Sequence, residues 1–286
     1  MADTATTRIF LLGYPRSGTT LLQSLLAAHP EVLSLPETFF FTHVVPSGRR
    51  WRLLRRAHPK ARERLRELEG HGIEVAPRGL RETLPIATAG PTVARFVSSL
   101  DTRASRNGKS AWVEKTPIHL HHVDTIERYV SDARFVHMVR AGLPAIASLY
   151  SVTREHPEPW GGVRSLDSCV RRWRSDIRRS YDCVGKPDHA FVAYERLVDD
   201  PPAVLATLTQ RLHLKSDLET IETMMANYAG TTSSIVNDEP WKSSVGSPIA
   251  NRNTARVTTL FSVAEREEIV HRIAPEERFV AAMPFL

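Results

Sequence analysis

The chain has 286 residues, of which 42% are hydrophobic and 24% are charged, and this balance predicts one globular domain over residues 1–286. No apolar run reaches membrane-spanning length, and residues 1–8 lack the features of a secretion signal, so we expect a cytoplasmic protein without a membrane span. The net charge of +6 suits anionic small molecules, acidic proteins or nucleic acid and does not choose among them.

Short apolar runs alternate with amphipathic segments along the chain. The predicted strands are residues 8–13, 31–35, 110–115, 134–140 and 189–195. The predicted helices are residues 18–28, 118–130, 142–154 and 165–184. This alternation predicts an α/β fold, with a parallel β-sheet flanked by helices on both faces and with helical insertions. Ligands of such sheets bind at the carboxyl ends of the strands.

The first predicted turn, GYPRSGTT at 13–20, has the composition of a phosphate-binding loop. Gly13 and Gly18 bracket a turn whose backbone N–H groups, with those of the next helix, point at one anion. Thr19 stands where a nucleotide-hydrolysing loop has lysine, and Thr20 takes the Ser/Thr position. Arg16 supplies a forked, permanently charged donor instead. The predicted anion-binding residues of this P-loop-type sheet are Tyr14, Pro15, Arg16, Ser17, Gly18, Thr19 and Thr20.

Two segments interrupt the alternation. Residues 49–70 predict a helix dense in arginine, and residues 229–258, rich in small polar residues, predict a long loop that either covers a ligand or only connects helices. The basic run 49–66 is compatible with a module that binds nucleic acid or an acidic carrier protein. Glu63 and the two glutamates that follow make a solvated helix with ion pairs the simpler interpretation.

The two cysteines, Cys169 and Cys183, lie fourteen residues apart in a predicted helix. That separation is too long for a disulfide, and it differs from the spacing of metal ligands. We expect both cysteines to be reduced and structural.

Four motifs together resemble the sulfotransferases that use 3′-phosphoadenosine-5′-phosphosulfate (PAPS). GYPRSGTTLLQSLLAAHPEVLSLPET resembles the loop that binds the 5′-phosphosulfate, and its arginine form matches the bacterial and tyrosylprotein-type members best. The other motifs are WVEKTP at 112–117, RFVHMVRAGLPAIASLYS at 134–151 and AYERLVDDP at 193–201. The resemblance implies PAPS as the donor, adenosine 3′,5′-bisphosphate (PAP) as the product, and transfer without a metal ion.

The resemblance also implies donor contacts outside the loop. Arg140 ends a predicted strand and Ser148 lies a little over two helical turns later, so both can reach one anion, which in the family is the 3′-phosphate of PAPS. Tyr194 resembles the family's tyrosine near the nucleotide. A basic loop near the C-terminus closes over the 3′-phosphate in the family, and here Arg252 or Arg256, in NRNTARVTTLFS, supplies its charge.

Sulfonate transfer requires a base for the acceptor proton and a cation near the leaving oxygen. The cytosolic branch of the family uses a histidine in a K-T-H pattern, and this chain has K-T-P at 115–117. Glu37 matches the base of the tyrosylprotein-type enzymes, and Lys115 matches the lysine that stabilises the leaving oxygen beside Arg16. A helix N-terminal carboxylate and a solvated strand-end lysine are the alternatives for these two residues.

Two expectations concern the neighbours of this site. Phe39 and Phe40 are expected to line the pocket and raise the pKa of Glu37. Three clustered histidines lack a fourth partner for a metal, and we expect them to face solvent or the acceptor cleft, where each is a substitute for the base. They are His119, His121 and His122.

Segments 36–108 and 155–185 match no family motif and are expected to shape the acceptor site. We expect a small-molecule hydroxyl as acceptor, before an amine or a protein tyrosine. Only six of the 38 basic residues are lysines, which suggests a GC-rich genome and bacterial secondary metabolism. The alternative enzyme is a P-loop kinase or other nucleotide-binding protein, which would require lysine in place of Thr19. No nucleic-acid partner is expected.

Overall fold

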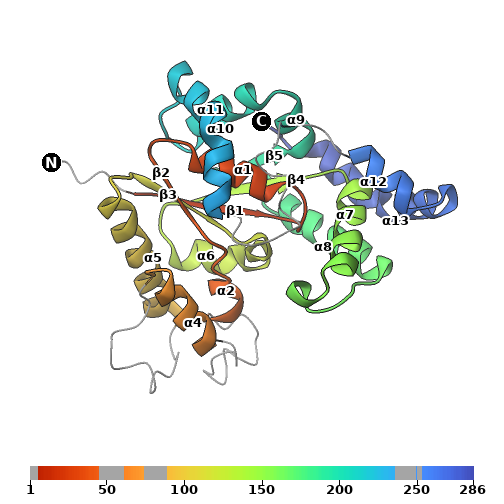
Figure 1. The fold of residues 1–286 in the computed structure, drawn as a ribbon, viewed down its shortest axis with the longest axis horizontal. Coiled ribbons are helices and arrows are strands. Elements are labelled where there is room, and N and C mark those ends of the chain that lie inside the picture. Colours follow the sequence, from red (N-terminus) through yellow and green to blue (C-terminus); the bar gives the residue numbers. More distant parts are fainter. Residues whose placement is uncertain (1–5, 45–60, 74–88, 236–248, 250–252) are drawn as a thin grey trace.

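The computed structural model describes residues 6–44, 61–73, 89–235, 249 and 253–286, and Figure 1 shows their arrangement. In these residues five strands form one parallel sheet in the order β2-β3-β1-β4-β5. The strands are β1 (Thr7–Gly13), β2 (Val32–Leu35), β3 (Ala111–Lys115), β4 (Ala133–Val139) and β5 (His189–Ala193). The predicted α/β fold is confirmed, and the predicted strand ends are shifted by at most two residues.

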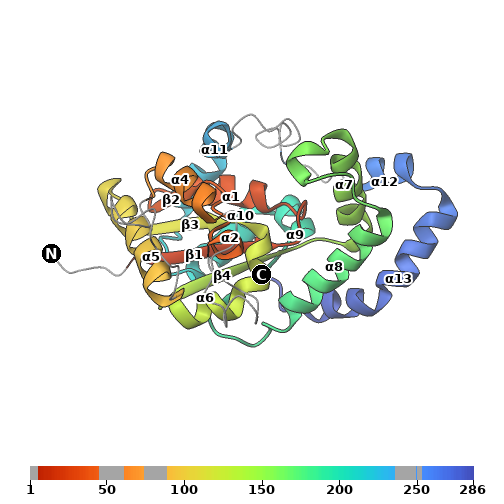
Figure 2. The ribbon, with the colours of Figure 1, turned by 90° about the horizontal axis from the view of Figure 1, so that it is seen from below.

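Alternate side chains of the strands pack into two apolar cores on opposite faces of the sheet. Ile9 and Leu11 of β1 belong to one core, whereas Phe10 and Leu12 belong to the other. The first face is covered by α1 (Thr19–Ala27), α10 (Pro201–Arg211) and α11 (Leu218–Ile235). The second is covered by α5 (Ala89–Arg106), α6 (Val123–Tyr129), α8 (Leu166–Tyr181) and α13 (Val263–Ala282), and Figures 1 and 2 show both layers.

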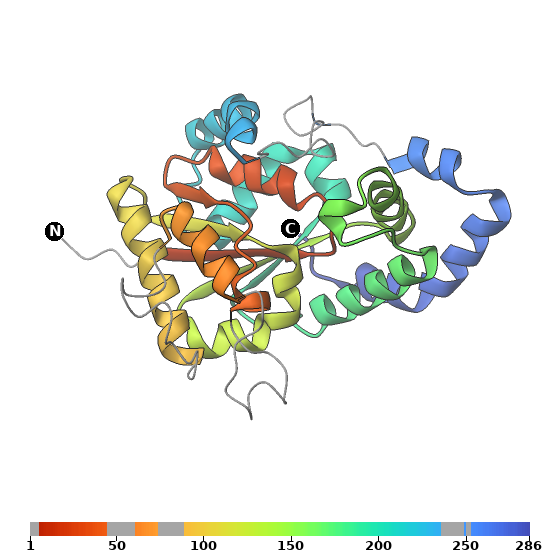
Figure 3. The same ribbon diagram turned by 60° about the horizontal axis from the view of Figure 1, so that its bottom comes forward.

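The remaining elements surround the two ends of the sheet. They are α2 (Phe40–His43), α4 (Ala61–Gly70), the 3₁₀ helices η1 (Pro117–His122) and η2 (Glu158–Trp160), α7 (Gly142–Glu155), α9 (Tyr194–Asp199) and α12 (Asn253–Leu260). Figure 3 shows α7, α12 and α13 at the end of the molecule toward which the strands run. No helix among the described residues is both long and apolar enough to cross a membrane.

The prediction of a loop over residues 229–258 is wrong at both ends of this segment. Residues 229–235 continue α11, and residues 253–258 belong to α12. Small polar residues are weak helix formers, but packing outweighs that preference here. Thr231 of α11 donates a hydrogen bond of 2.9 Å to the carbonyl oxygen of Ser24 on α1, and Val257 of α12 is buried in the second core.

The arginine-rich segment falls partly outside the described residues. Residues 45–60 are not described, whereas residues 61–70 form α4, as the helical pattern predicts. Arg64 and Glu67 form an ion pair one turn apart on α4, which agrees with the solvated helix expected there.

Candidate active site

The predicted site residues follow the carboxyl ends of the strands, and the register brings these ends to one edge of the sheet. In the central strand β1, Leu11 pairs with Lys115 of β3, and Gly13 pairs with Met138 of β4. Leu35, the last residue of β2, lies opposite the residue before Lys115. Segments that are far apart in the sequence therefore meet at this edge, where parallel sheets bind their ligands.

The loop between β1 and α1 is shaped by its own backbone. Ser17 donates two hydrogen bonds to the carbonyl oxygen of Tyr14, from Oγ at 2.7 Å and from its backbone N–H at 3.1 Å. Arg16 and Gly18 adopt left-handed conformations, with φ of 73° and 99°. A Cβ atom on Gly18 would lie 2.6 Å from the ring of Tyr194, so the loop rests on this ring only because position 18 is glycine.

The N-terminus of α1 is directed into this loop. Gly18 is its N-cap residue and has no side chain to bond the first N–H groups, and the first turn, which includes Thr19 and Thr20, contains no acidic residue. Free N–H groups at the positive end of a helix favour a bound anion. Tyr14 points away from the loop, because its hydroxyl donates to the carbonyl oxygen of Cys169 at 3.3 Å. Burial raises the pKa of Tyr14 well above its usual value, so this hydroxyl stays a donor.

Two arginines contact Ser148, which is buried on α7, and a third arginine is bonded to one of them. Arg16 Nε lies 3.4 Å and Arg256 Nη1 lies 3.3 Å from Ser148 Oγ. Arg140, directly after β4, donates from Nη1 to the carbonyl oxygen of Arg16 at 2.9 Å, and its guanidinium lies 4.3 Å from the centre of the Tyr194 ring. Burial lowers the pKa of Arg140, and the positive charge of Arg256 acts in the same direction. A cluster of like charges of this kind favours a bound anion.

Arg256 is one of the two candidates for the basic segment near the C-terminus. The other, Arg252, lies outside the described residues. Arg256 reaches Ser148 because α12 packs beside α7, with Val257 buried in the core next to it. Residues that are 108 positions apart thus share one hydrogen bond at the site.

Lys115 and Glu37 form an ion pair between Nζ and Oε1. The lysine side chain is 1% exposed and the glutamate side chain 25% exposed, so the solvated lysine considered above is wrong. A buried ammonium requires such a partner. Phe40 is turned away into the core, where its ring stacks on Phe96 with centroids 3.9 Å apart. The expectation that Phe40 lines the pocket of Glu37 is therefore wrong, and the close neighbour of this carboxylate is an ammonium.

A buried carboxylate behind this pair was missed in the sequence. Glu114 accepts hydrogen bonds from the hydroxyls of Thr38 (2.8 Å) and Thr116 (2.5 Å) and from Nδ1 of His119 (3.0 Å). His119 Nε2 accepts from the N–H of Phe41 at 3.2 Å, which assigns the imidazole proton to Nδ1. Burial raises the pKa of Glu114, but the hydrogen bonds from His119 and from the two hydroxyls outweigh it, so the pKa is lowered.

The Glu114 network fixes the backbone on both sides of the Lys115–Glu37 pair. The N–H groups of Thr38 and Phe39 lie 3.1 Å and 3.3 Å from Thr116 Oγ1, so the segment after β2 is held against the segment after β3. The signal in the sequence was a glutamate inside an otherwise apolar strand, in AWVEK. Such a residue is rare without partners. Thr116 and His119 are close to it in the sequence, whereas Thr38 is brought to it by the pairing of β2 with β3, which the sequence does not state.

The expectation for the three histidines is wrong for two of them. His119 and His122 are buried, and only His121 is partly exposed, with Nε2 2.6 Å from Asp176 Oδ1. With both ring nitrogens engaged, His119 has no nitrogen left to serve as a substitute base. Burial lowers the pKa of His122 to about 3, and the charges of His119 and His121 add to this effect.

Residues 8–217 match the profile of a sulfotransferase family, which is most of the chain. The chain belongs to the sulfotransferase family. The chain is similar to protein-tyrosine sulfotransferase A of Caenorhabditis elegans, at 24% identity over 212 residues, or 73% of this chain and 50% of that protein. It is also similar to a putative protein-tyrosine sulfotransferase of Caenorhabditis briggsae, at 28% identity over 213 residues, or 72% and 65%. It spans about half to two-thirds of their length.

Solved structures share the fold of this sulfotransferase. The sulfotransferase domain of the Synechococcus olefin synthase has a TM-score of 0.56 at 21% identity, covering 96% of this chain and 97% of that domain. A mouse sulfotransferase complexed with PAP has a TM-score of 0.52 at 12% identity, covering 95% and 85%. The likeness at these identities concerns the fold, and it agrees with the five-stranded parallel sheet flanked by helices.

Proposed function

We propose that this sulfotransferase moves a sulfonate group from PAPS to a hydroxyl group of a small molecule. The observation that carries the proposal is the cluster of Arg16, Arg140 and Arg256 around Ser148, beside a loop that lacks the lysine of nucleotide hydrolases. The loop and the N-terminus of α1 suit the 5′-phosphosulfate. The arginine cluster suits the 3′-phosphate, which is the group that distinguishes PAPS from ATP. Membership in the sulfotransferase family supports this assignment.

Arg16 connects the two anion sites. Its side chain contacts Ser148, and its carbonyl oxygen accepts a hydrogen bond from Arg140. Donor binding is expected to keep the backbone contact, which fixes the loop, and to replace the 3.4 Å side-chain contact by bonds to the sulfonate and phosphate oxygens. Tyr194 then holds the loop at Gly18 and the guanidinium of Arg140 in one arrangement.

The transfer is an in-line displacement at sulfur. The acceptor oxygen forms a bond to sulfur while the bond from sulfur to the 5′-phosphate oxygen breaks, and PAP leaves with the electron pair. Glu37 accepts the proton of the hydroxyl group, and Lys115 donates to the leaving oxygen. No step of this scheme requires a metal ion.

The Lys115–Glu37 pair couples the two roles. In the structure the ammonium and the carboxylate neutralise each other at the edge of the sheet. The bridging oxygen of the donor becomes negatively charged and competes with the carboxylate of Glu37 for the ammonium of Lys115, because Lys115 can bond to either anion. Binding of PAPS therefore frees the carboxylate to accept a proton when an acceptor is present. The Glu114 network keeps both backbones in place during this exchange.

The acceptor is proposed to bind among residues 36–108 and 155–185, which contain α2, α4, α5 and α8. A small-molecule hydroxyl is the first candidate. A tyrosine hydroxyl in a protein is the second, favoured by the similarity to protein-tyrosine sulfotransferases. Release of PAP from PAPS, measured with alcohols, phenols, an amine and a tyrosine peptide, tests this order. Turnover with the peptide alone would overturn the small-molecule assignment.

The role of Glu37 is tested by Glu37→Gln. This change removes the proton acceptor but keeps the size of the side chain, so kcat should fall by about 10²–10⁴-fold, the usual contribution of general base catalysis. Affinity for PAP, measured by calorimetry, should not fall, because Glu37 does not contact the donor and its charge no longer competes with the donor for Lys115. Glu222→Gln, at an exposed position on α11 outside the proposed acceptor segments, is the control and should keep full activity. Full activity of Glu37→Gln would remove Glu37 from the mechanism.

A further inference from the structure

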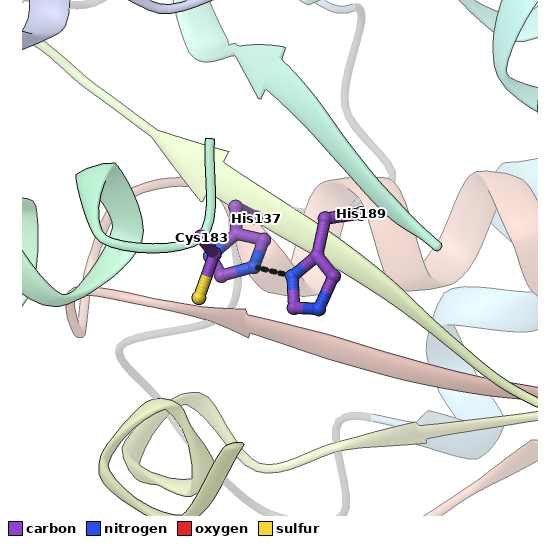
Figure 4. A group of neighbouring side chains, drawn as sticks. All are labelled: His137, Cys183 and His189. Carbon is purple, nitrogen blue, oxygen red and sulfur yellow. Dashed lines mark hydrogen bonds between the residues drawn. The ribbon is translucent and has the colours of Figure 1, made fainter. Parts of the chain in front are cut away.

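A cluster of two histidines and a cysteine lies on the sheet face that α6 and α8 cover. It consists of His137 on β4, His189 at the start of β5 and Cys183, two residues beyond the end of α8 (Figure 4). The three side chains are buried. His137 precedes Arg140 by three residues, or about 10 Å at ~3.3 Å per strand residue, so the cluster is separate from the anion site.

The three side chains present their ligand atoms to one small volume. One nitrogen or sulfur atom from each lies within 4.8 Å of the other two, and His137 Nε2 is 2.8 Å from His189 Nδ1. A tetrahedral zinc ion, with bonds of about 2.0–2.3 Å to nitrogen and sulfur, places its ligand atoms about 3.3–3.6 Å apart. The cluster supplies three of the four ligands of such an ion, once the imidazoles separate slightly and Cys183 moves closer to them, and a water molecule would be the fourth.

The groups around the cluster orient both imidazoles as ligands. His189 Nε2 is 3.0 Å from Glu127 Oε1, and Lys186 Nζ donates to the same carboxylate at 2.7 Å. A carboxylate at Nε2 holds the proton there and leaves the lone pair of Nδ1 directed at His137. Ser180 Oγ lies 3.2 Å from Nδ1 of His137 and is an acceptor for the proton of that ring. Histidine ligands of metals usually donate their second nitrogen in this way.

We propose that His137, Cys183 and His189 bind a zinc ion that connects the end of α8 to β4 and β5. In the metal-free chain the two imidazoles share a hydrogen bond and Cys183 donates to the carbonyl oxygen of Arg179 at 3.5 Å. On binding, the proton of His137 moves from Nε2 to Nδ1 and is donated to Ser180. The thiol of Cys183 loses its proton to solvent, so one proton is released for each zinc ion.

The protonation states of the cluster fit this exchange. Burial raises the pKa of the Cys183 thiol to about 11, although the nearby charge of Lys186 opposes it. Burial, with the charges of His189 and Lys186, holds the pKa of His137 well below its usual value, so this ring is neutral near pH 7. Carboxylates that raise the thiol pKa are Glu127, Asp124 and Asp182.

The test is a titration of the full, chelator-treated chain with Co²⁺, a spectroscopic substitute for zinc, followed by displacement with Zn²⁺. We expect one Co²⁺ per chain and a thiolate-to-cobalt absorption band in the near ultraviolet that Zn²⁺ abolishes. Cys169→Ser is the matched control, since Cys169 is also buried but belongs to no such cluster within the described residues. The chain has two cysteines, so in this variant Cys183 alone can supply the thiolate.

Cys183→Ser should lose the absorption band and bind Zn²⁺ at least about tenfold more weakly, as expected when a ligand of a metal site is removed. The same band and affinity in Cys183→Ser would overturn the proposal. Absence of the band in both the unaltered chain and Cys169→Ser would also overturn it. Cys183 is the one cysteine that remains in Cys169→Ser, so the absorption band of this variant tests Cys183 directly. The proposal can therefore be tested even if Cys183→Ser does not fold.

Discussion

At the scale of single residues, the proposed donor site is assembled from three separate segments that bring positive charge to one serine. Arg16 comes from the loop after β1 and Arg256 from α12, and both contact Ser148, whereas Arg140, from the end of β4, donates to the backbone of Arg16. Each guanidinium is permanently charged and offers forked donors, which suits the oxygens of a phosphate. The positive charge of these three arginines is most simply explained if the site binds a dianionic group such as a 3′-phosphate.

Arg256→Ala tests which phosphate this cluster binds. Loss of one charge-assisted contact should weaken PAP binding by about 10–100-fold, while adenosine 5′-monophosphate, which has no 3′-phosphate, should bind within about threefold of its original affinity. Competition calorimetry with both nucleotides measures the difference. Arg278→Ala, at an exposed position on α13, is the control. Equal losses for both nucleotides would place Arg256 at the 5′ end instead.

Individual site residues could be predicted where they lie at or just after the end of a predicted strand. Arg16, Glu37, Lys115 and Arg140 each follow an apolar run, and the structure places all four at one edge of the sheet. The orientation of the histidines could not be predicted, because polar residues in a short 3₁₀ helix give no periodic pattern. His119 is held in the interior by its bonds to Glu114, five residues before it, and to the backbone of Phe41, which is 78 residues away in the sequence.

At the scale of elements, the ends of β2 and β3 are joined by polar bonds instead of by apolar packing. Glu114, the fourth residue of β3, collects two hydroxyls and an imidazole in a fully buried place. A buried carboxylate is tolerated only when its oxygens are bonded in this way. The bonds also fix the distance between the two elements that carry Glu37 and Lys115.

Thr116→Val tests this positioning. The change keeps the shape of the side chain but removes the hydroxyl that donates to Glu114 and accepts from the backbone of Thr38. The free energy of unfolding should fall by about 1–3 kcal/mol, since a buried carboxylate loses a partner. The kcat should fall about tenfold or more, with PAP affinity retained, because Glu37 shifts relative to the donor.

Thr116→Ser is the matched control for this prediction. It restores the hydroxyl without the methyl group, so most of the kcat should return. If the valine variant loses stability but keeps its kcat, the network stabilises the fold only and does not position the catalytic pair.

The strands could be predicted from the sequence more reliably than the segments around them. The strands β1, β4 and β5 are mostly apolar runs that are buried on both faces of the sheet, and this pattern can be recognised without knowing their neighbours. The end of α11 and the start of α12 could not be predicted, because their helical conformation depends on packing against α1 and α7. The order β2-β3-β1-β4-β5, which creates the Glu114 network, also has no local signal.

At the scale of the whole molecule, buried histidines make stability depend on pH. Burial is the largest cause that lowers the pKa values of His122, His137 and His189, so each is more easily protonated in the unfolded chain than in the folded one. Their contribution to stability is fully present above the unfolded pKa, about 6.5, and is lost as the pH falls toward the folded values.

His122→Leu should flatten this dependence. Between pH 6.5 and about 4.5 the unaltered chain should lose up to about 1.4 kcal/mol per pH unit more than the variant, because one group no longer takes up a proton on unfolding. Denaturant unfolding at a series of pH values measures the slope. His271→Leu, at an exposed position on α13, should keep the original slope. Parallel curves for the unaltered chain and His122→Leu would contradict the assigned role of burial.

The central claim is that the loop at 13–20 and the arginine cluster together bind a nucleotide with a 3′-phosphate. Calorimetric titration of the full chain with PAP and with ATP tests it most directly. The account predicts that PAP binds at one site and at least about tenfold more tightly than ATP, a difference of about 1.4 kcal/mol or more. Tighter binding of ATP, or no binding of PAP, would contradict the assignment of PAPS as the donor.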